Sequence, residues 1–63
     1  MTPRGVIARL RREGWGERAG KGAHLVFSKE GKVTVVSNHS GDIPARTLRA
    51  ICKQVGWEFP PQR

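Results

Sequence analysis

A two-residue turn between two strand-like runs constrains the fold of this chain most strongly. Glu30-Gly31 has the composition of a tight hairpin turn, and it separates residues 23–28 from residues 32–36. The second run is rich in β-branched residues, which favour strands. The first run alternates, with three side chains on each face: Ala23, Leu25 and Phe27 on one, His24, Val26 and Ser28 on the other. This pattern predicts an antiparallel sheet with one covered face and one open face.

Two helices are expected, one on each side of this hairpin in the sequence. The first is predicted near residues 3–13, with Thr2 as its cap and Gly14 at its end. The second has Pro44 in its first turn and Gly56 at its stop. Its apolar positions follow the helical spacing i, i+3, i+4, i+7: Leu48, Ile51, Cys52 and Val55.

A short strand over residues 15–18 completes an α-β-β-β-α order. The predicted fold class is α+β, a three-stranded antiparallel sheet with both helices on one face, and it resembles double-stranded-RNA-binding domains. We expect residues 1–63 to form a single domain in which residues 57–63 are an extended C-terminal arm. So short a chain buries only roughly 60% of the surface that it exposes when unfolded, which excludes large nucleotide-binding folds.

The charge balance indicates the kind of partner. The chain has 12 Lys and Arg against 5 Asp and Glu, a net charge of +7, which points to a polyanion: RNA, DNA, an acidic protein or an anionic membrane. No run approaches the length of a membrane span, and we expect no membrane partner. A single cysteine, Cys52, cannot form an intrachain disulfide, so the expected compartment is the reducing cytoplasm.

Most catalytic signatures are missing from the sequence. There is no glycine-rich phosphate loop, the one cysteine and two histidines lack zinc-site spacing, and the carboxylates are scattered, so we predict no metal site and no cofactor. The two histidines remain as candidate catalytic groups, because the ordinary pKa of imidazole, about 6.5, suits proton transfer near neutrality. RNA carries its own nucleophile, the ribose 2′-OH, so a small basic protein with a histidine is compatible with a metal-independent ribonuclease.

His24 is the main candidate for this chemistry. It directly follows the glycine-rich turn 20–23, where glycines allow a phosphate to approach the backbone and where Lys21 could neutralise its charge. On spacing alone, a histidine on the open face of a strand is more often an ordinary surface residue. A catalytic role and an ordinary surface position therefore both remain open for His24. His39 lies in a polar loop, where capping or hydrogen bonding is the more frequent role.

Arg46, Arg49 and Lys53 recur at helical spacing on a face of the last helix away from its apolar stripe. They form a candidate phosphate-binding stripe, since basic side chains on a helix suit phosphates. A solvated helix face is as good an explanation for any one of them, but less so for all three.

Several short motifs in order resemble one family over nearly the whole chain. They are Gly14-Trp15, then Gly22-Ala23-His24 with Phe27, then Ile43-Pro44, Thr47-Leu48-Arg49, Ile51 and Lys53-Gln54-Val55-Gly56. On these motifs the chain is similar to HicA-type (YcfA-like) toxins, small mRNA interferases of prokaryotic type II toxin–antitoxin pairs.

The resemblance implies a fold, an activity and a partner. It implies a double-stranded-RNA-binding-like fold, ribosome-independent cleavage of mRNA, and neutralisation by a HicB-type antitoxin that obstructs the site. It matches His24 to the family's catalytic histidine and His39, more weakly, to a second histidine before the last helix.

Three positions depart from the family pattern. Ala23 replaces a serine whose hydroxyl could bond the imidazole or the phosphate, and Ser37 replaces a common proline. Arg46 replaces a glycine and puts a cation at a helix N-terminus, where a bound phosphate could offset the unfavourable dipole.

Taken together, the residues and the resemblance predict an RNA-cleaving toxin with histidine acid–base chemistry: His24 catalytic, His39 a candidate second catalytic residue, and Lys21, Arg46, Arg49 and Lys53 contacting RNA. The alternative is a non-catalytic RNA-binding module of the same fold. A third class is an interaction protein whose basic face binds an acidic partner. Incubation with RNA, with and without a chelator, separates the first two.

Overall fold

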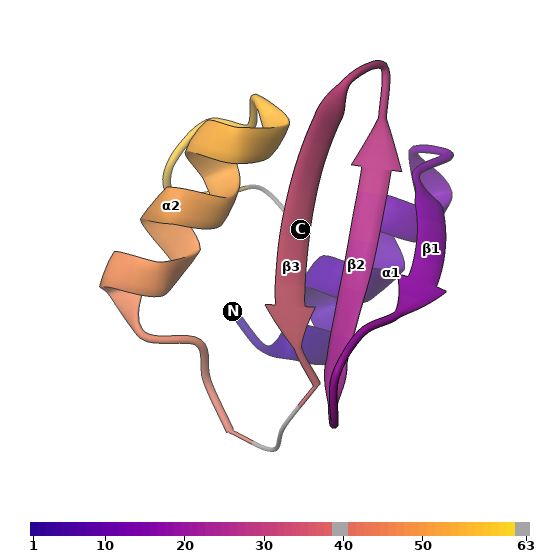
Figure 1. Cartoon of the computed structure of the whole chain (residues 1–63). Helices are drawn as coiled ribbons and strands as arrows, with labels where there is room; N and C mark the ends of the chain where they lie inside the picture. The colour runs from indigo at the N-terminus through magenta and orange to yellow at the C-terminus, as the bar shows by residue number, and fades with distance from the viewer. Residues whose placement is uncertain (39–40, 62–63) are drawn as a thin grey trace.

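The computed structural model describes residues 1–38 and 41–61 and contains two helices and one sheet over this part of the chain (Figure 1). In chain order the elements are α1 (Pro3–Arg12), β1 (Gly16–Ala19), β2 (His24–Lys29), β3 (Lys32–Ser37) and α2 (Ala45–Val55). The sheet order is β1-β2-β3, and both strand pairs are antiparallel. The predicted α-β-β-β-α order and open three-stranded sheet are therefore confirmed.

The hairpin between β2 and β3 has the turn that the sequence predicts. Glu30 and Gly31 both have positive φ, 51° and 81°, as a two-residue turn of this twist requires. Lys29 pairs with Lys32 beside the turn, and the register continues to His24 opposite Ser37 at the far end. β2 begins at His24, one residue later than predicted, and β3 extends one residue further, to Ser37.

The two faces of the sheet differ sharply in burial. Phe27, Thr34 and Val36 are between 0% and 1% exposed on the face toward the helices. Val33 and Val35, on the opposite face, are 54% and 48% exposed. In Figure 1, α1 lies behind the strands and α2 lies beside β3, so no helix covers the front of the sheet.

The core joins the apolar stripes of both helices to the sheet. Thr34, the buried polar residue within it, donates its hydroxyl to Oε1 of Gln54 over 2.7 Å, so β3 and α2 are linked by a satisfied hydrogen bond. The stripe predicted for the last helix is buried as expected. The helical members of the core are Val6, Ile7 and Leu10 from α1 and Leu48, Ile51, Cys52 and Val55 from α2. None of the described helices is long and apolar enough to cross a membrane.

The helix ends follow the predicted signals with small shifts. Thr2 caps α1 by accepting a hydrogen bond from the Gly5 N–H over 3.1 Å. α1 ends at Arg12, one residue earlier than predicted. Pro44 is the N-cap of α2, just outside the helix, and Gly56, with φ 80°, is the C-cap that follows Val55.

The prediction that Trp15 begins a strand is wrong. β1 starts at Gly16, and the Trp15 side chain is buried, with 7% exposure, in the core. The Trp15 N–H donates to the Leu10 carbonyl over 3.1 Å, next to the positive-φ Gly14. Its backbone therefore closes the C-terminal end of α1 instead of joining the sheet.

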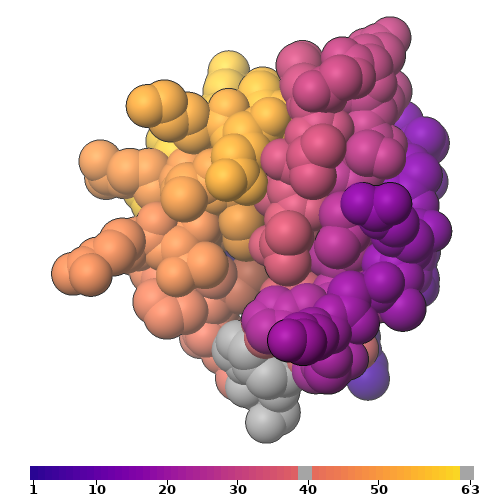
Figure 2. All heavy atoms as spheres, in the orientation of Figure 1, coloured from indigo at the N-terminus to yellow at the C-terminus, as the bar shows by residue number. Residues whose placement is uncertain are grey.

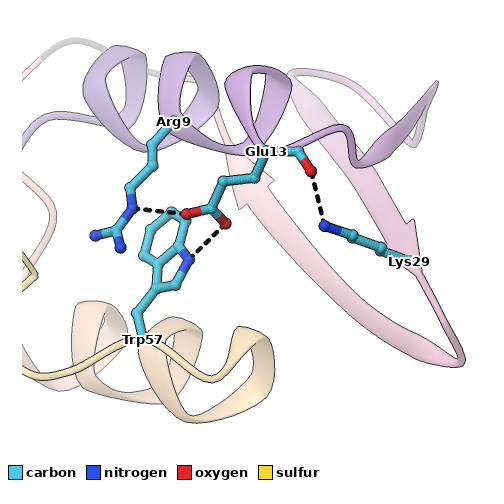
Figure 3. Close-up of polar contacts among 4 residues, drawn as sticks. All are labelled: Arg9, Glu13, Lys29 and Trp57. Carbon is cyan, nitrogen blue, oxygen red and sulfur yellow. Dashed lines mark hydrogen bonds and ion pairs between the residues drawn. The ribbon is translucent and has the colours of Figure 1, made fainter.

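Glu13, at the C-terminus of α1, joins three parts of the chain (Figure 3). Its carboxylate accepts from Trp57 Nε1 over 2.9 Å and from Arg9 Nε over 3.0 Å, and its carbonyl accepts from Lys29 Nζ over 2.7 Å. The Arg9 guanidinium also lies 4.1 Å from the centre of the Trp57 ring. These contacts fasten the start of the C-terminal tail, described as far as residue 61, to α1 and β2.

Glu13 should make the stability of the fold depend on pH. Burial opposes ionisation, but the hydrogen bonds from Trp57 and Arg9 outweigh it and hold the pKa of Glu13 below its usual value of 4.5. A lowered folded-state pKa gives stability above the unfolded-state pKa that disappears as pH falls through the folded-state value. At neutral pH, Glu13→Gln should therefore lose about 1 kcal/mol of unfolding free energy, measured in urea.

The difference between wild type and Glu13→Gln should shrink as the pH falls below 4.5. The control is Glu58→Gln, which replaces an exposed carboxylate that makes no ion pair within residues 1–38 and 41–61. This role for Glu13 would be contradicted if the loss of unfolding free energy in Glu13→Gln stayed constant with pH. An equal loss in Glu58→Gln would contradict it as well.

Candidate functional site

His24 is held by its own turn, which engages one ring nitrogen; the other has no hydrogen-bond partner within residues 1–38 and 41–61. It is the first residue of β2 and is exposed. Its Nδ1 lies 2.8 Å from the backbone carbonyl of Lys21. A carbonyl oxygen only accepts hydrogen bonds, so Nδ1 carries the proton and donates it. In the neutral ring Nε2 is then unprotonated and is the nitrogen able to take a proton.

The turn between β1 and β2 places this ring. The Lys21 carbonyl also accepts from the His24 N–H over 3.1 Å, and the Gly20 N–H donates to the His24 carbonyl over 2.9 Å. Gly22 has φ 60°, which favours glycine. A Cβ on Gly20 would lie 3.3 Å from the His24 carbonyl oxygen. These glycines therefore allow a close turn that orients the imidazole.

An open hollow of about 420 Å³ lies between β3 and α2, and His24 lines it. Two other lining residues are polar, Ser37 at the end of β3 and Thr47 in the first turn of α2. The remaining lining residues are apolar: Val35, Val36, Ile43, Pro44 and Ile51. The hollow thus combines apolar walls with an imidazole and two hydroxyls.

A second hollow, of about 500 Å³, is slightly larger but lies along α1. Its lining includes Gly5, Ala8, Arg12 and Asp42 and no histidine. The imidazole whose ordinary pKa suits proton transfer near neutrality lies at the other hollow.

The open face of the sheet near His24 is cationic. Arg18 sits opposite Val26 in the register, on the same face as His24, and Lys21 lies in the adjoining turn. The strand positions on this face include no carboxylate; they are Gly16, Arg18, His24, Val26, Ser28, Val33, Val35 and Ser37. Within the described residues, neither Arg18 nor Lys21 is in an ion pair. An anion at His24 would therefore meet unpaired positive charge.

The predicted stripe on α2 is exposed but lies apart from the hollow. Arg46, Arg49 and Lys53 are all exposed, and none of them lines the hollow. The Arg49 guanidinium lies 4.8 Å from the centre of the Phe59 ring, on the tail. In Figure 2, long side chains of α2 project outward, away from the strands. Helical spacing places this stripe opposite the buried stripe, so it can contact only groups outside the hollow.

Two further residues that the sequence raised are His39 and Cys52. His39 lies outside the described residues, so its predicted secondary role stays a prediction. Cys52 is 1% exposed, as expected for a small buried hydrophobe, and burial raises the pKa of its thiol. Over residues 1–38 and 41–61, no three His, Cys, Asp or Glu side chains gather as a metal site would require.

Comparison with known proteins identifies the family. Residues 3–57, most of the chain, match the family model described as the HicA toxin of bacterial toxin-antitoxin. The chain belongs to the HicA toxin family. It is therefore a toxin of a toxin–antitoxin system, and the HicA family implies a cognate antitoxin as its partner. A search of curated proteins finds no match to this HicA chain.

Two residues at the hollow were not predicted from the sequence. The sequence marks Ser37 only as a departure from the family pattern, and Thr47 only as part of a motif. A signal for Ser37 exists, because a two-residue turn at Glu30-Gly31 pairs His24 with Ser37. No comparable signal exists for Thr47, since its position depends on how α2 packs beside β3.

The turn that orients His24 can be tested separately from any activity. Gly22→Ala and Gly31→Ala both place a Cβ at positive φ, 60° and 81°, with nothing within 4 Å to clash. Each should cost about 1–2 kcal/mol of stability. Only Gly22→Ala should disturb the Nδ1–H tautomer of His24, which ¹⁵N NMR of the imidazole at a pH where the ring is neutral would detect. Equal ¹⁵N shifts in both variants would show that the turn does not select the tautomer.

Proposed function

We propose that this HicA-family toxin is an endoribonuclease that cleaves mRNA by proton transfer at His24. The observation that carries the proposal is the exposed imidazole whose Nδ1 is engaged by the Lys21 carbonyl, which leaves Nε2 available. Family membership supports the toxin role, and the cationic surroundings support a phosphate substrate.

The chemistry needs only groups that the chain and the RNA supply. Nε2 of His24 takes the proton of a ribose 2′-OH, and the 2′-oxygen attacks the adjacent phosphorus. The O2′–P bond forms, the P–O5′ bond breaks, and the leaving 5′-oxygen receives a proton from the imidazolium or from water. The products are a 2′,3′-cyclic phosphate and a 5′-OH. No water and no metal-bound hydroxide is required as nucleophile.

Cations on two surfaces have separate roles in this proposal. Lys21, in the turn that holds His24, and Arg18, on the same face of the sheet, stabilise the extra negative charge on phosphorus in the transition state. Arg46, Arg49 and Lys53 hold phosphates of neighbouring nucleotides, which fixes the position of the strand without reading its sequence.

The cognate antitoxin in this proposal is of the HicB type and covers the same face. Val33 and Val35 expose apolar surface on the open face that carries His24. A protein that buries these two valines would also keep RNA away from the imidazole. Binding to the folded state would add stability to a small domain at the same time.

Replacing the proposed proton-transfer group tests the activity. His24→Ala should lower cleavage of single-stranded RNA by roughly 10²–10⁴-fold, because general acid–base catalysis contributes about that much. The far-ultraviolet circular dichroism should be unchanged, since the residue is exposed. Cleavage by wild type should persist in EDTA, yield 5′-OH ends, and stop when a 2′-deoxynucleotide is placed at the cleaved bond.

Ser28→Ala is the matched control, because Ser28 lies on the same strand and the same face as His24. It should cleave like the wild type. Full cleavage by a folded His24→Ala variant would rule out the assignment. RNA binding without cleavage by the wild type would favour the non-catalytic module instead.

The stripe on α2 is tested by salt dependence, using the His24→Ala background so that RNA stays intact. Affinity should fall steeply with salt, and Arg46→Ala/Lys53→Ala should flatten the slope of log K against log salt by about 0.7 for each phosphate that the variant no longer binds. The control Arg4→Ala/Arg12→Ala removes the same charge from exposed positions of α1. Equal slopes for the two double variants would show that the stripe makes no specific phosphate contact.

A further inference from the structure

We infer that the hollow between β3 and α2 is a nucleobase subsite, which receives one unpaired base of the RNA beside the phosphate that His24 attacks. This inference rests on the proposed RNA cleavage and adds which part of the substrate fills the hollow. It commits to a base of single-stranded RNA as the occupant.

The position of the hollow ties its occupant to the reacting bond. His24 is one of its lining residues, so the hollow adjoins the residue proposed to move the proton. In RNA, one of the two bases that flank the cleaved bond is attached to the ribose whose 2′-OH attacks, and the other to the ribose whose 5′-oxygen leaves. A base seated here would therefore position one of these two riboses relative to Nε2.

The walls of the hollow suit a base and not a phosphate. Val35, Val36, Ile43 and Ile51 are apolar, and a phosphate held among them would lose hydration with no Lys or Arg in the lining to compensate. The flat faces of a base are apolar enough to pack against such side chains. The volume of about 420 Å³ also falls in the range, roughly 300–1,000 Å³, of sites that take small organic groups.

Two hydroxyls provide the contacts that a base edge needs. Ser37 and Thr47 line the hollow from opposite elements, β3 and α2. Neither side chain has a hydrogen-bond partner within residues 1–38 and 41–61. Each hydroxyl can both donate and accept, so the pair can bond the polar edge of a base and favour some bases over others.

The subsite requires an RNA strand that is unpaired at this point. A base inside a duplex is stacked and paired, and it cannot enter a hollow in a protein without leaving the helix. The same fold, when it reads duplex RNA, does so by shape and needs no such hollow. The structure therefore favours a single-stranded substrate for this toxin.

An abasic scan of a short synthetic RNA tests the subsite. An abasic nucleotide keeps the ribose, the 2′-OH and the phosphate but removes the base, so the chemistry itself stays possible. With wild-type protein, base loss at one nucleotide flanking the cleaved bond should lower kcat/KM by about tenfold or more, and base loss elsewhere should do much less. The same RNA annealed to its complement should be cleaved far more slowly.

The variant Ser37→Ala/Thr47→Val shows whether the hollow causes this effect. Cleavage of a random-sequence RNA pool, mapped by sequencing the new ends, should lose its nucleotide preference at the scanned position. The control Ser28→Ala removes a hydroxyl from the same open face outside the hollow and should keep the wild-type preference.

The outcomes separate this inference from the proposed function. Cleavage that depends on His24, with a flat abasic scan or an unchanged preference in the double variant, overturns the subsite and leaves the nuclease intact. A wild type that cleaves no RNA overturns both. If Ser37→Ala/Thr47→Val keeps its cleavage preference but binds the cognate antitoxin more weakly, the hollow receives a protein side chain and the inference is wrong.

Discussion

The register of the β2–β3 hairpin is the constraint on which both the core and the site depend. The turn at Glu30-Gly31, with both residues at positive φ, pairs His24 with Ser37 and directs Phe27 to the helices. Side chains alternate along a strand, so a slip of one residue would exchange the two faces. It would expose Phe27, which is 0% exposed, and turn His24 toward the interior. One tight turn therefore determines both which side chains stabilise the protein and which one is available for chemistry.

The helices extend this arrangement into a site. The hydrogen bond from Thr34 to Gln54 and the burial of Ile51 hold α2 beside β3, and Thr47 then lies across the hollow from Ser37. A core of this size stabilises a small domain by only about 3–5 kcal/mol, so each such link matters. Because the site lies on strand and helix ends that the core holds, its groups need little rearrangement before they act.

Much of the architecture could be predicted from local patterns. The hairpin, the cap at Thr2 and the buried stripe of α2 all rest on spacing or turn chemistry that acts over a few residues. The start of the first strand could not be predicted in this way. The Trp15 N–H donates to the Leu10 carbonyl instead of joining the sheet, and this hydrogen bond depends on how α1 ends. The fastening of the tail through Glu13 could not be predicted either, because its partners Lys29 and Trp57 lie 16 and 44 residues away in the sequence.

The sequence by itself determined the order of elements, the open face of the sheet and the exposure of His24, because period-two alternation and a two-residue turn act locally. It also determined the positive charge, which is a matter of composition. Only the tertiary structure decided that Thr47 shares a hollow with His24 and that the Arg46, Arg49 and Lys53 stripe lies outside it. The physical reason is that these relations depend on how α2 packs against β3, and packing is settled by contacts between segments far apart in the chain.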